Sequence, residues 1–89
     1  MIFRLHAIRR MYERGIGVED VRHVLATGRI IEEYPNDSPY PSCLILGSAG
    51  LRPVHVVVAL NSLEHETIVI TVYEPDPARW EPGLGRRRT

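Results

Sequence analysis

Apolar residues near the start of the chain recur at the spacing of an amphipathic helix. The stripe consists of Leu5, Ile8, Met11 and Tyr12. This pattern predicts a helix over residues 6–14 that packs on the core through the stripe. Gly15 suits the end of this helix, because glycine adopts the left-handed conformation of a C-terminal cap without steric cost.

A second helix is expected directly after the first. Its apolar stripe contains Val18, Val21, Val24 and Leu25. Glu19 and Asp20 fall in its first turn, where the positive end of the helix dipole favours acidic side chains. Because only residues 15–17 separate the two stripes, the helices should form a tight αα-hairpin.

After residue 28 the hydrophobic pattern changes to a period of two, which is typical of strands. Four runs between turn residues are strand candidates: residues 29–34, 42–46, 53–60 and 66–73. A short strand over residues 1–5 is a further candidate. Consecutive strands with short loops pair antiparallel. The sequence therefore predicts an α+β fold, with an N-terminal αα-hairpin packed on one face of a roughly four-stranded, mostly antiparallel sheet.

Alternation along the last two strands assigns their side chains to the two faces of that sheet. The face toward the helices should hold Val54, Val56, Val58, Leu60, Ile68, Ile70 and Val72. His55 and Tyr73 then share the face away from the helices. Because that face mixes polar and apolar residues, it suits a shallow binding surface or a homodimer interface.

The size and composition of the chain fit one domain. The 89 residues are 44% apolar and 25% charged, and prolines after the last strand bar regular structure there. We expect a single domain over residues 1–80 and a mobile, arginine-rich tail over residues 81–89. No apolar run reaches the ~20 residues that span a bilayer, and the single Cys43 cannot form an internal disulfide. A cytoplasmic location is therefore the expectation.

The net charge of zero conceals basic ends and an acidic middle. Residues 1–30 hold six arginines against three acids, residues 31–78 hold one arginine against seven, and residues 79–89 hold four arginines against one. All eleven basic residues are arginine, whose planar fork binds phosphate or carboxylate in a bidentate manner. The two ends are therefore candidates for contact with an anion, although codon bias in a GC-rich genome is the simpler explanation.

One face of the first predicted helix carries three residues suited to phosphodiester chemistry. His6, Arg10 and Arg14 lie at i, i+4 and i+8. Arginines can hold a scissile phosphate, and a histidine can move a proton near neutral pH. The alternative interpretation is an ordinary solvated helix face, in which the arginines pair with nearby glutamates.

The second candidate group is the pair of His55 and Tyr73 on the sheet. A histidine beside a tyrosine can act as acid and base. The alternative is a half-buried histidine whose ring nitrogens are satisfied by hydrogen bonds. The four histidines and the cysteine lack the spacing of metal ligands, and the chain has no glycine-rich phosphate loop. Neither a metal nor a cofactor is expected.

Longer stretches of the chain resemble a bacterial and archaeal domain-of-unknown-function family. Residues 6–16 are similar to its HAxxRMxxRGI motif, and residues 71–80 are similar to its TVYEPDPxxW motif. This family resembles the RelE/MqsR-like toxin superfamily, whose members have two N-terminal helices on a curved antiparallel sheet. The resemblance implies a type II toxin that cleaves mRNA without a metal, with a YgiT/MqsA-type zinc-finger antitoxin as its partner. The family's recurrent polar positions, and so the candidate catalytic residues, are His6, Arg10, Arg14, His55 and Tyr73.

Two functions from different classes stay open at this point. In the endoribonuclease hypothesis, a 2′-hydroxyl attacks the adjacent phosphate, with His6 or His55 as acid or base and Tyr73 orienting or stacking on a base. Arg10 and Arg14 would bind the phosphate. In the alternative, the chain keeps the fold but is a catalytically inactive protein-binding module, which suits its neutral charge. Convergence of the helix residues with the sheet pair in one concavity would favour the enzyme.

Overall fold

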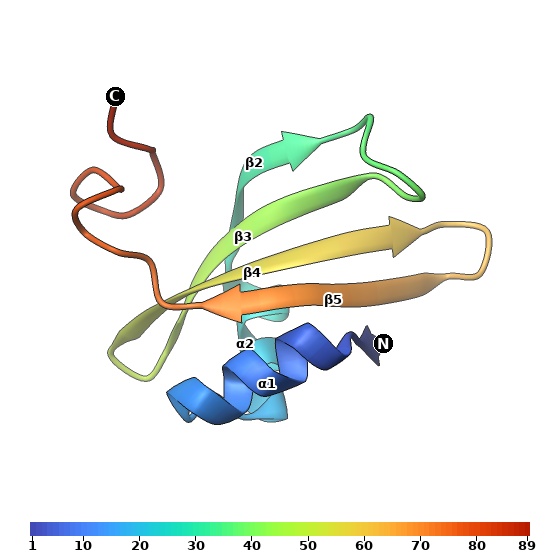
Figure 1. Ribbon diagram of the computed structural model, residues 1–89, viewed down its shortest axis with the longest axis horizontal. Helices are drawn as coiled ribbons and strands as arrows, with labels where there is room; N and C mark the ends of the chain where they lie inside the picture. The colour runs from blue at the N-terminus through green and yellow to red at the C-terminus, as the bar shows by residue number, and fades with distance from the viewer.

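Two helices cover one face of a five-stranded sheet in the computed structural model, which describes residues 1–89 (Figure 1). In chain order the elements are β1 (Ile2–Phe3), α1 (Leu5–Arg14), α2 (Val18–Thr27), β2 (Arg29–Tyr34), β3 (Ser42–Ala49), β4 (Arg52–Asn61) and β5 (Glu66–Tyr73). The strand order is β1-β5-β4-β3-β2, and all neighbours are antiparallel except β1 and β5. The predicted α+β class is confirmed.

The sheet has five strands, whereas the sequence predicts about four. The additional strand is β1, in which Ile2 and Phe3 pair in parallel with Ile68 and Val69 of β5. Two residues are too few to show a period of two, and their partners lie near the other end of the chain. The strand lies within the further candidate at residues 1–5, and its parallel pairing with β5 depends on a contact between distant parts of the chain.

The two helices follow each other through the predicted short link, and each packs mainly on the sheet rather than on the other helix. α1 lies over β5, whereas α2 lies over β3 and β4 (Figure 1). The short link between them is as predicted: Gly15 ends α1 with a φ of 64°, and the Gly17 N–H donates to the Asp20 carboxylate at 2.8 Å. Each helix buries its apolar side on a different part of the sheet, which leaves little contact between them.

The side of α1 that faces the sheet also differs from the predicted one. Ala7 and Met11 are buried, whereas Leu5, Ile8 and Tyr12 are 61%, 49% and 89% exposed. The prediction that the whole apolar stripe faces the core is therefore wrong for three of its four residues. Because α1 lies over a single strand near the edge of the sheet, only one sector of the helix is covered.

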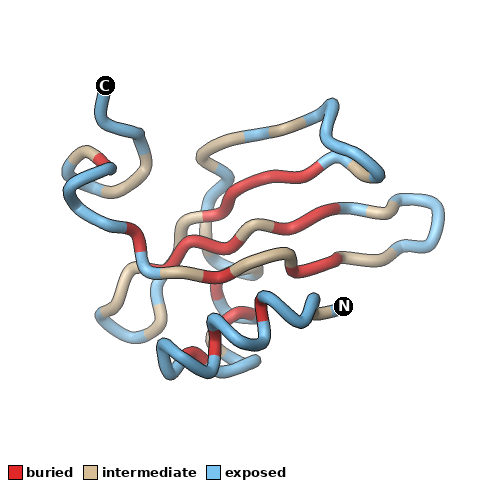
Figure 2. Tube along the Cα trace, in the orientation of Figure 1, coloured by how far each residue is buried: buried red, intermediate tan, exposed pale blue.

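The hydrophobic core lies between the helices and the sheet, where the inner rows of residues are buried (Figure 2). Its buried members are Ala7, Met11, Ile16, Val21, Val24, Cys43, Ile45, Val54, Val56, Val58, Val69 and Val72. Burial raises the pKa of the Cys43 thiol, in accord with a packing role. A Cβ atom at Gly47 would lie 2.8 Å from the Val24 side chain, so glycine at this position allows α2 to approach β3 closely.

A β-bulge between β4 and β5 changes which residues of β5 face the helices. Val57 pairs with Thr71, but Val58 pairs with Val69, so Ile70 is an extra residue that reverses the alternation. Val69 and Val72 therefore both reach the core, while Ile68 turns to the other face. The predicted helix-facing set of Ile68, Ile70 and Val72 is wrong in this respect.

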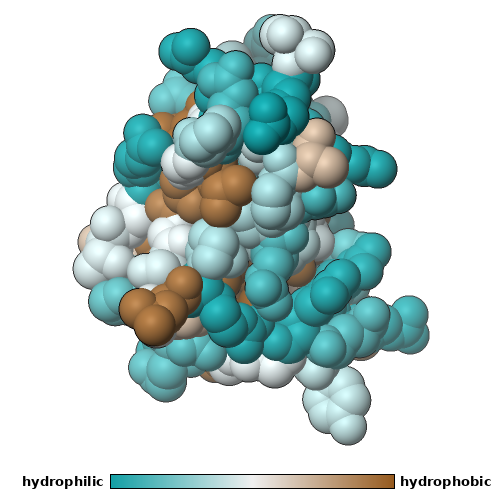
Figure 3. All heavy atoms as spheres, turned by 90° about the vertical axis from the view of Figure 1, so that its left-hand side faces the viewer, coloured by the Kyte–Doolittle hydropathy of each residue, from teal (hydrophilic) through white to brown (hydrophobic).

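The chain beyond β5, called here the C-terminal segment (residues 74–89), turns back over the sheet face that no helix covers (Figure 1). Trp80 and Arg87 form an isolated β-bridge within it, and the Glu81 N–H donates to the Arg86 carbonyl at 2.8 Å. On the side of the molecule where this segment ends, the surface is mainly hydrophilic (Figure 3). The mobility expected for residues 81–89 stays a prediction. None of the helices has the length and apolar character needed to cross a membrane.

The orientation of α1 can be tested by shortening one buried and one exposed side chain of the same helix. Met11→Ala should lower the free energy of unfolding by about 2–5 kcal/mol, because it leaves a cavity in the core. Tyr12→Ala should change it by no more than about 0.5 kcal/mol, because Tyr12 is 89% exposed. Urea denaturation measures both values, and a large loss for Tyr12→Ala would contradict the observed orientation.

Candidate functional site

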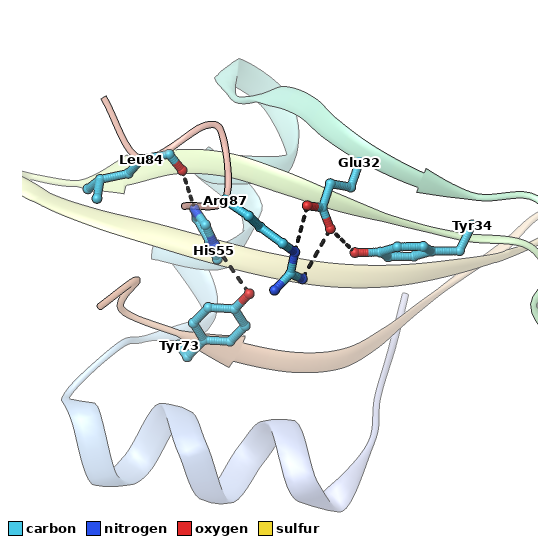
Figure 4. Close-up of polar contacts among 6 residues, drawn as sticks. All are labelled: Glu32, Tyr34, His55, Tyr73, Leu84 and Arg87. Carbon is cyan, nitrogen blue, oxygen red and sulfur yellow. Dashed lines mark hydrogen bonds and ion pairs between the residues drawn. The ribbon is translucent and has the colours of Figure 1, made fainter. Parts of the chain in front are cut away.

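His55 is the centre of a polar cluster on the helix-free face of the sheet. It lies in β4, pairs with Tyr73 of β5 in the strand register and is 0% exposed. Its Nδ1 atom lies 3.2 Å from the Tyr73 hydroxyl, and its Nε2 atom lies 2.8 Å from the Leu84 carbonyl oxygen (Figure 4). The prediction that His55 and Tyr73 share the face away from the helices is confirmed.

The hydrogen-bond partners of His55 determine which ring nitrogen carries the proton. A carbonyl oxygen can only accept, so Nε2 must donate its proton to Leu84. In the neutral ring Nδ1 is then the acceptor, and the Tyr73 hydroxyl donates to it. Burial lowers the pKa of His55, which favours this neutral form at pH 7. Burial also raises the pKa of Tyr73, which keeps the phenol protonated.

Aromatic packing seals His55 from solvent. The Trp80 ring meets the imidazole edge to face, with ring centroids 4.5 Å apart, and Tyr73 meets it at 5.2 Å. Trp80 is itself only 3% exposed. Because Trp80 belongs to the C-terminal segment, this segment covers the imidazole.

An ion pair joins the end of the C-terminal segment to β2 on the same face of the sheet. Arg87 donates from Nε and Nη2 to the two carboxylate oxygens of Glu32 at 2.8 and 3.1 Å, and its guanidinium lies 4.7 Å from the centre of the Trp80 ring. The hydrogen bonds from Arg87 lower the pKa of Glu32, and those to Glu32 raise the pKa of Arg87. Tyr34 donates a further hydrogen bond to Glu32.

A second bulge brings Glu32 to this face. In β2, Ile30 pairs with Ile45 of the core, but Glu32 pairs with Leu44, one residue out of the regular register. The extra residue, Ile31, reverses the alternation, so Ile30 and Glu32 point to opposite faces. Without the bulge, Glu32 would point toward the helices and could not meet Arg87.

A pocket of ≈ 220 Å³ opens beside Tyr73 under the start of the C-terminal segment. It is lined by Tyr73, Glu74, Asp76, Arg79, Trp80 and Arg87. The Arg87 guanidinium lies between the Glu32 carboxylate and the Tyr73 ring, and its Nη1 atom makes no hydrogen bond (Figure 4). The pocket therefore places a phenol backed by an imidazole next to guanidinium groups that can hold an anion.

The structure does not bring the other three candidate residues to this pocket. His6, Arg10 and Arg14 are exposed on α1, which packs on the opposite face of the sheet. No side chain of the three makes a hydrogen bond or ion pair, although the Arg14 carbonyl accepts from Arg52 at 2.6 Å. The five candidates thus form two separate groups within one chain, and the catalytic roles assigned to them stay predictions.

Several residues of the site carry no sequence signal for it. Arg87 lies in the generic arginine-rich end, and its partner Glu32 lies 55 positions earlier. Trp80 is predictable as an anchor, but its contact with His55 depends on how the C-terminal segment turns. Leu84 takes part through its backbone carbonyl, which any residue would supply. Strand alternation predicts only that His55 and Tyr73 share a face, because their direct pairing depends on the bulge in β5 that shifts the register by one residue.

The fold and this cluster define the chain as a small α+β domain with a covered polar site on its sheet. Residues 3–74 match a family described as a domain of unknown function, DUF4258, and the chain belongs to that family. No curated protein and no solved structure matches the chain. The matched residues include His55 and Tyr73 but end where the C-terminal segment begins.

The free energy of unfolding should fall as the pH drops below 6.5. The pKa of His55 is lowered by burial from 6.5 in the folded protein, so below that pH the unfolded chain binds the proton first. The stability contributed by neutral His55 is full above pH 6.5 and is lost as the pH falls through the folded pKa. Urea denaturation between about pH 8 and about pH 4 measures this dependence.

His55→Gln provides the control for that measurement. Glutamine does not titrate, so the loss of stability just below pH 6.5 should disappear in this variant. A second loss, below pH 4.5, should remain, because hydrogen bonds from Arg87 lower the pKa of Glu32 from that value in the folded state. An unchanged profile just below pH 6.5 in His55→Gln would contradict the assignment.

Trp80, the only tryptophan, reports directly on the C-terminal segment. Arg87→Ala removes the ion pair with Glu32 and the cation beside the indole, so acrylamide should quench Trp80 fluorescence more strongly than in the wild type. Arg86→Ala is the matched control, because the neighbouring Arg86 side chain makes no hydrogen bond or ion pair. Equal quenching in the two variants would show that Arg87 does not fasten the segment.

Proposed function

We propose that this chain is a RelE/MqsR-like toxin that cleaves mRNA in the cytoplasm without a metal, and that its reactive pair is Tyr73 with His55. The observation that carries the proposal is the hydrogen bond from the Tyr73 hydroxyl to His55 Nδ1 at the wall of a pocket that also holds two arginines. The similarity of residues 6–16 and 71–80 to a family that resembles this superfamily supports it. A YgiT/MqsA-type zinc-finger antitoxin is the partner that the resemblance implies.

The pair can move a proton between substrate and imidazole. As the 2′-oxygen of a ribose forms a bond with the adjacent phosphorus, its proton passes to the Tyr73 oxygen while the Tyr73 proton passes to His55 Nδ1. The bond between phosphorus and the 5′-oxygen then breaks, and the leaving oxygen takes the proton back along the same path. The products are a 2′,3′-cyclic phosphate and a 5′-hydroxyl, and the enzyme is regenerated.

The electrostatics of the pocket suit the two steps. Burial lowers the pKa of His55, so the ring is neutral and ready to accept a proton at pH 7. The imidazolium that forms keeps its Nε2–H bond to the Leu84 carbonyl. Arg79 and the free Nη1 of Arg87 can hold the non-bridging phosphate oxygens and offset their developing charge.

One observation favours the second candidate function, a catalytically inactive protein-binding module of the same fold. His55 is 0% exposed with both ring nitrogens occupied, and no buried side-chain nitrogen or oxygen atom lacks a partner. A fully satisfied histidine can serve stability alone. The two candidates differ in whether the Tyr73 hydroxyl has any function beyond this hydrogen bond.

Cleavage of an end-labelled RNA oligonucleotide by the purified protein in EDTA tests the proposal. The wild type should release a 2′,3′-cyclic phosphate, and Tyr73→Phe should slow the reaction about 10²–10⁴-fold, because the phenyl ring keeps the packing but cannot relay a proton. Tyr12→Phe, on exposed α1, is the matched control and should cleave at the wild-type rate. A substrate with 2′-deoxyribose at the cleaved position should stay intact.

The outcomes separate the candidate functions and the candidate sites. Intact RNA with the wild type, together with normal growth of cells that express it, would contradict the toxin and favour the binding module. Cleavage that survives Tyr73→Phe but is lost in His6→Ala/Arg10→Ala would place the site on α1 instead. Cleavage lost in Tyr73→Phe and kept in the α1 double variant supports the sheet site.

A further inference from the structure

The outer side of α1 carries an apolar stripe that nothing in the chain covers. Leu5, Ile8 and Tyr12 occupy i, i+3 and i+7 of the helix and are 61%, 49% and 89% exposed. This is the spacing at which one helix presents anchors to another helix or to a groove. The stripe lies on the opposite layer from the pocket at Tyr73, so it is independent of the proposed cleavage site.

These residues cannot find cover within the fold. Ala7 and Met11 hold the inner side of α1 against β5, and rotation of the helix to bury the stripe would expose them. α2 lies over other strands and makes little contact with α1. Large apolar side chains kept in water on one side of a helix mark an interaction surface when they are contiguous.

The charge around the stripe indicates the character of the partner. Arg9 lies beside the stripe and Arg4 directly precedes the helix, whereas Arg10 and Arg14 lie on the opposite side of α1. Neither Arg4 nor Arg9 takes part in an ion pair. An acidic surface placed on α1 would pair with these free guanidinium groups, whereas a second copy of α1 would bring arginine against arginine.

We propose that the α1 stripe docks an amphipathic helix of a partner protein, with an apolar face for Leu5, Ile8 and Tyr12 and glutamate or aspartate along its edges. A lipid surface is the other occupant that a basic amphipathic helix can suit. A helix of ten residues that is packed into a domain and offers three apolar side chains gives little area for insertion into a bilayer. A protein partner therefore fits the observations better.

A displayed library of amphipathic peptides tests the proposal on the full-length protein. Each peptide spans about four helical turns, with apolar residues at i, i+3, i+4 and i+7 and the remaining positions drawn from Glu, Lys, Gln and Ala. Selection on the wild type should enrich Glu over Lys at the positions that flank the apolar stripe. The affinity of enriched peptides should fall about tenfold or more between about 50 and 500 mM NaCl.

Matched surface variants locate the binding. Leu5→Gln and Tyr12→Gln should each weaken binding about tenfold or more, because they remove anchors while glutamine maintains helix propensity. Arg9→Glu should weaken it about fivefold. Leu63→Gln is the control, because Leu63 is 93% exposed in the turn between β4 and β5 and does not belong to α1, so its replacement should leave the affinity within about twofold.

These experiments measure binding alone, so their result tests the docking proposal independently of RNA cleavage. Selection of Lys-rich peptides, or binding that survives both glutamine variants, would overturn the proposal. So would an absence of peptides that depend on α1. Self-association of the wild type that is lost in Tyr12→Gln, measured by sedimentation, would assign the stripe to a second copy of the chain. Binding to vesicles of anionic lipid that is lost in Leu5→Gln would assign it to a membrane. Either result would overturn the proposal of a partner helix.

Discussion

The burial of an imidazole on the helix-free face of the sheet is the constraint on which that whole face depends. His55 has no exposed surface, and a buried polar group left without a partner costs about 1–3 kcal/mol. Its two partners come from different parts of the chain, the Tyr73 hydroxyl on the neighbouring strand and the Leu84 carbonyl in the C-terminal segment. The register of β4 with β5 and the path of the C-terminal segment are therefore both needed to satisfy one ring.

The two faces of the sheet are stabilised by different kinds of interaction. On the helix side, packing is almost entirely apolar and includes the buried Cys43. On the other side, hydrogen bonds and an ion pair join β2, β4, β5 and the C-terminal segment through Glu32, His55, Tyr73 and Arg87. Two bulges make this division, because each reverses the alternation of its strand and directs neighbouring residues to opposite faces.

The same contacts that stabilise the polar cluster also set its chemistry. Fixing the His55 proton on Nε2 leaves Nδ1 as the acceptor for Tyr73, which is the arrangement that a proton relay requires. The residues that match the DUF4258 family contain Glu32, His55 and Tyr73, whereas Leu84 and Arg87 lie beyond them. The cluster is thus assembled from the matched region together with a segment outside it. The exposed stripe of α1, on the other layer, is a second surface with a different, apolar and basic character.

The sequence by itself determined the helices, the four longer strands and the α+β class, because periodicity, turn residues and glycine caps act over a few neighbouring residues. It also predicted that His55 and Tyr73 share one face, but their direct pairing depends on the bulge at Ile70, without which the hairpin register would set His55 opposite Val72. Tertiary structure alone decided the parallel pairing of β1 with β5, the exposed side of α1, the two bulges and the contact of Arg87 with Glu32. Each of these features depends on contacts with residues that are distant in the sequence. A helix or strand that could bury either of two sides buries the side on which neighbouring elements pack. The candidate site belongs mainly to this second group, because most of its contacts join residues that are far apart along the chain.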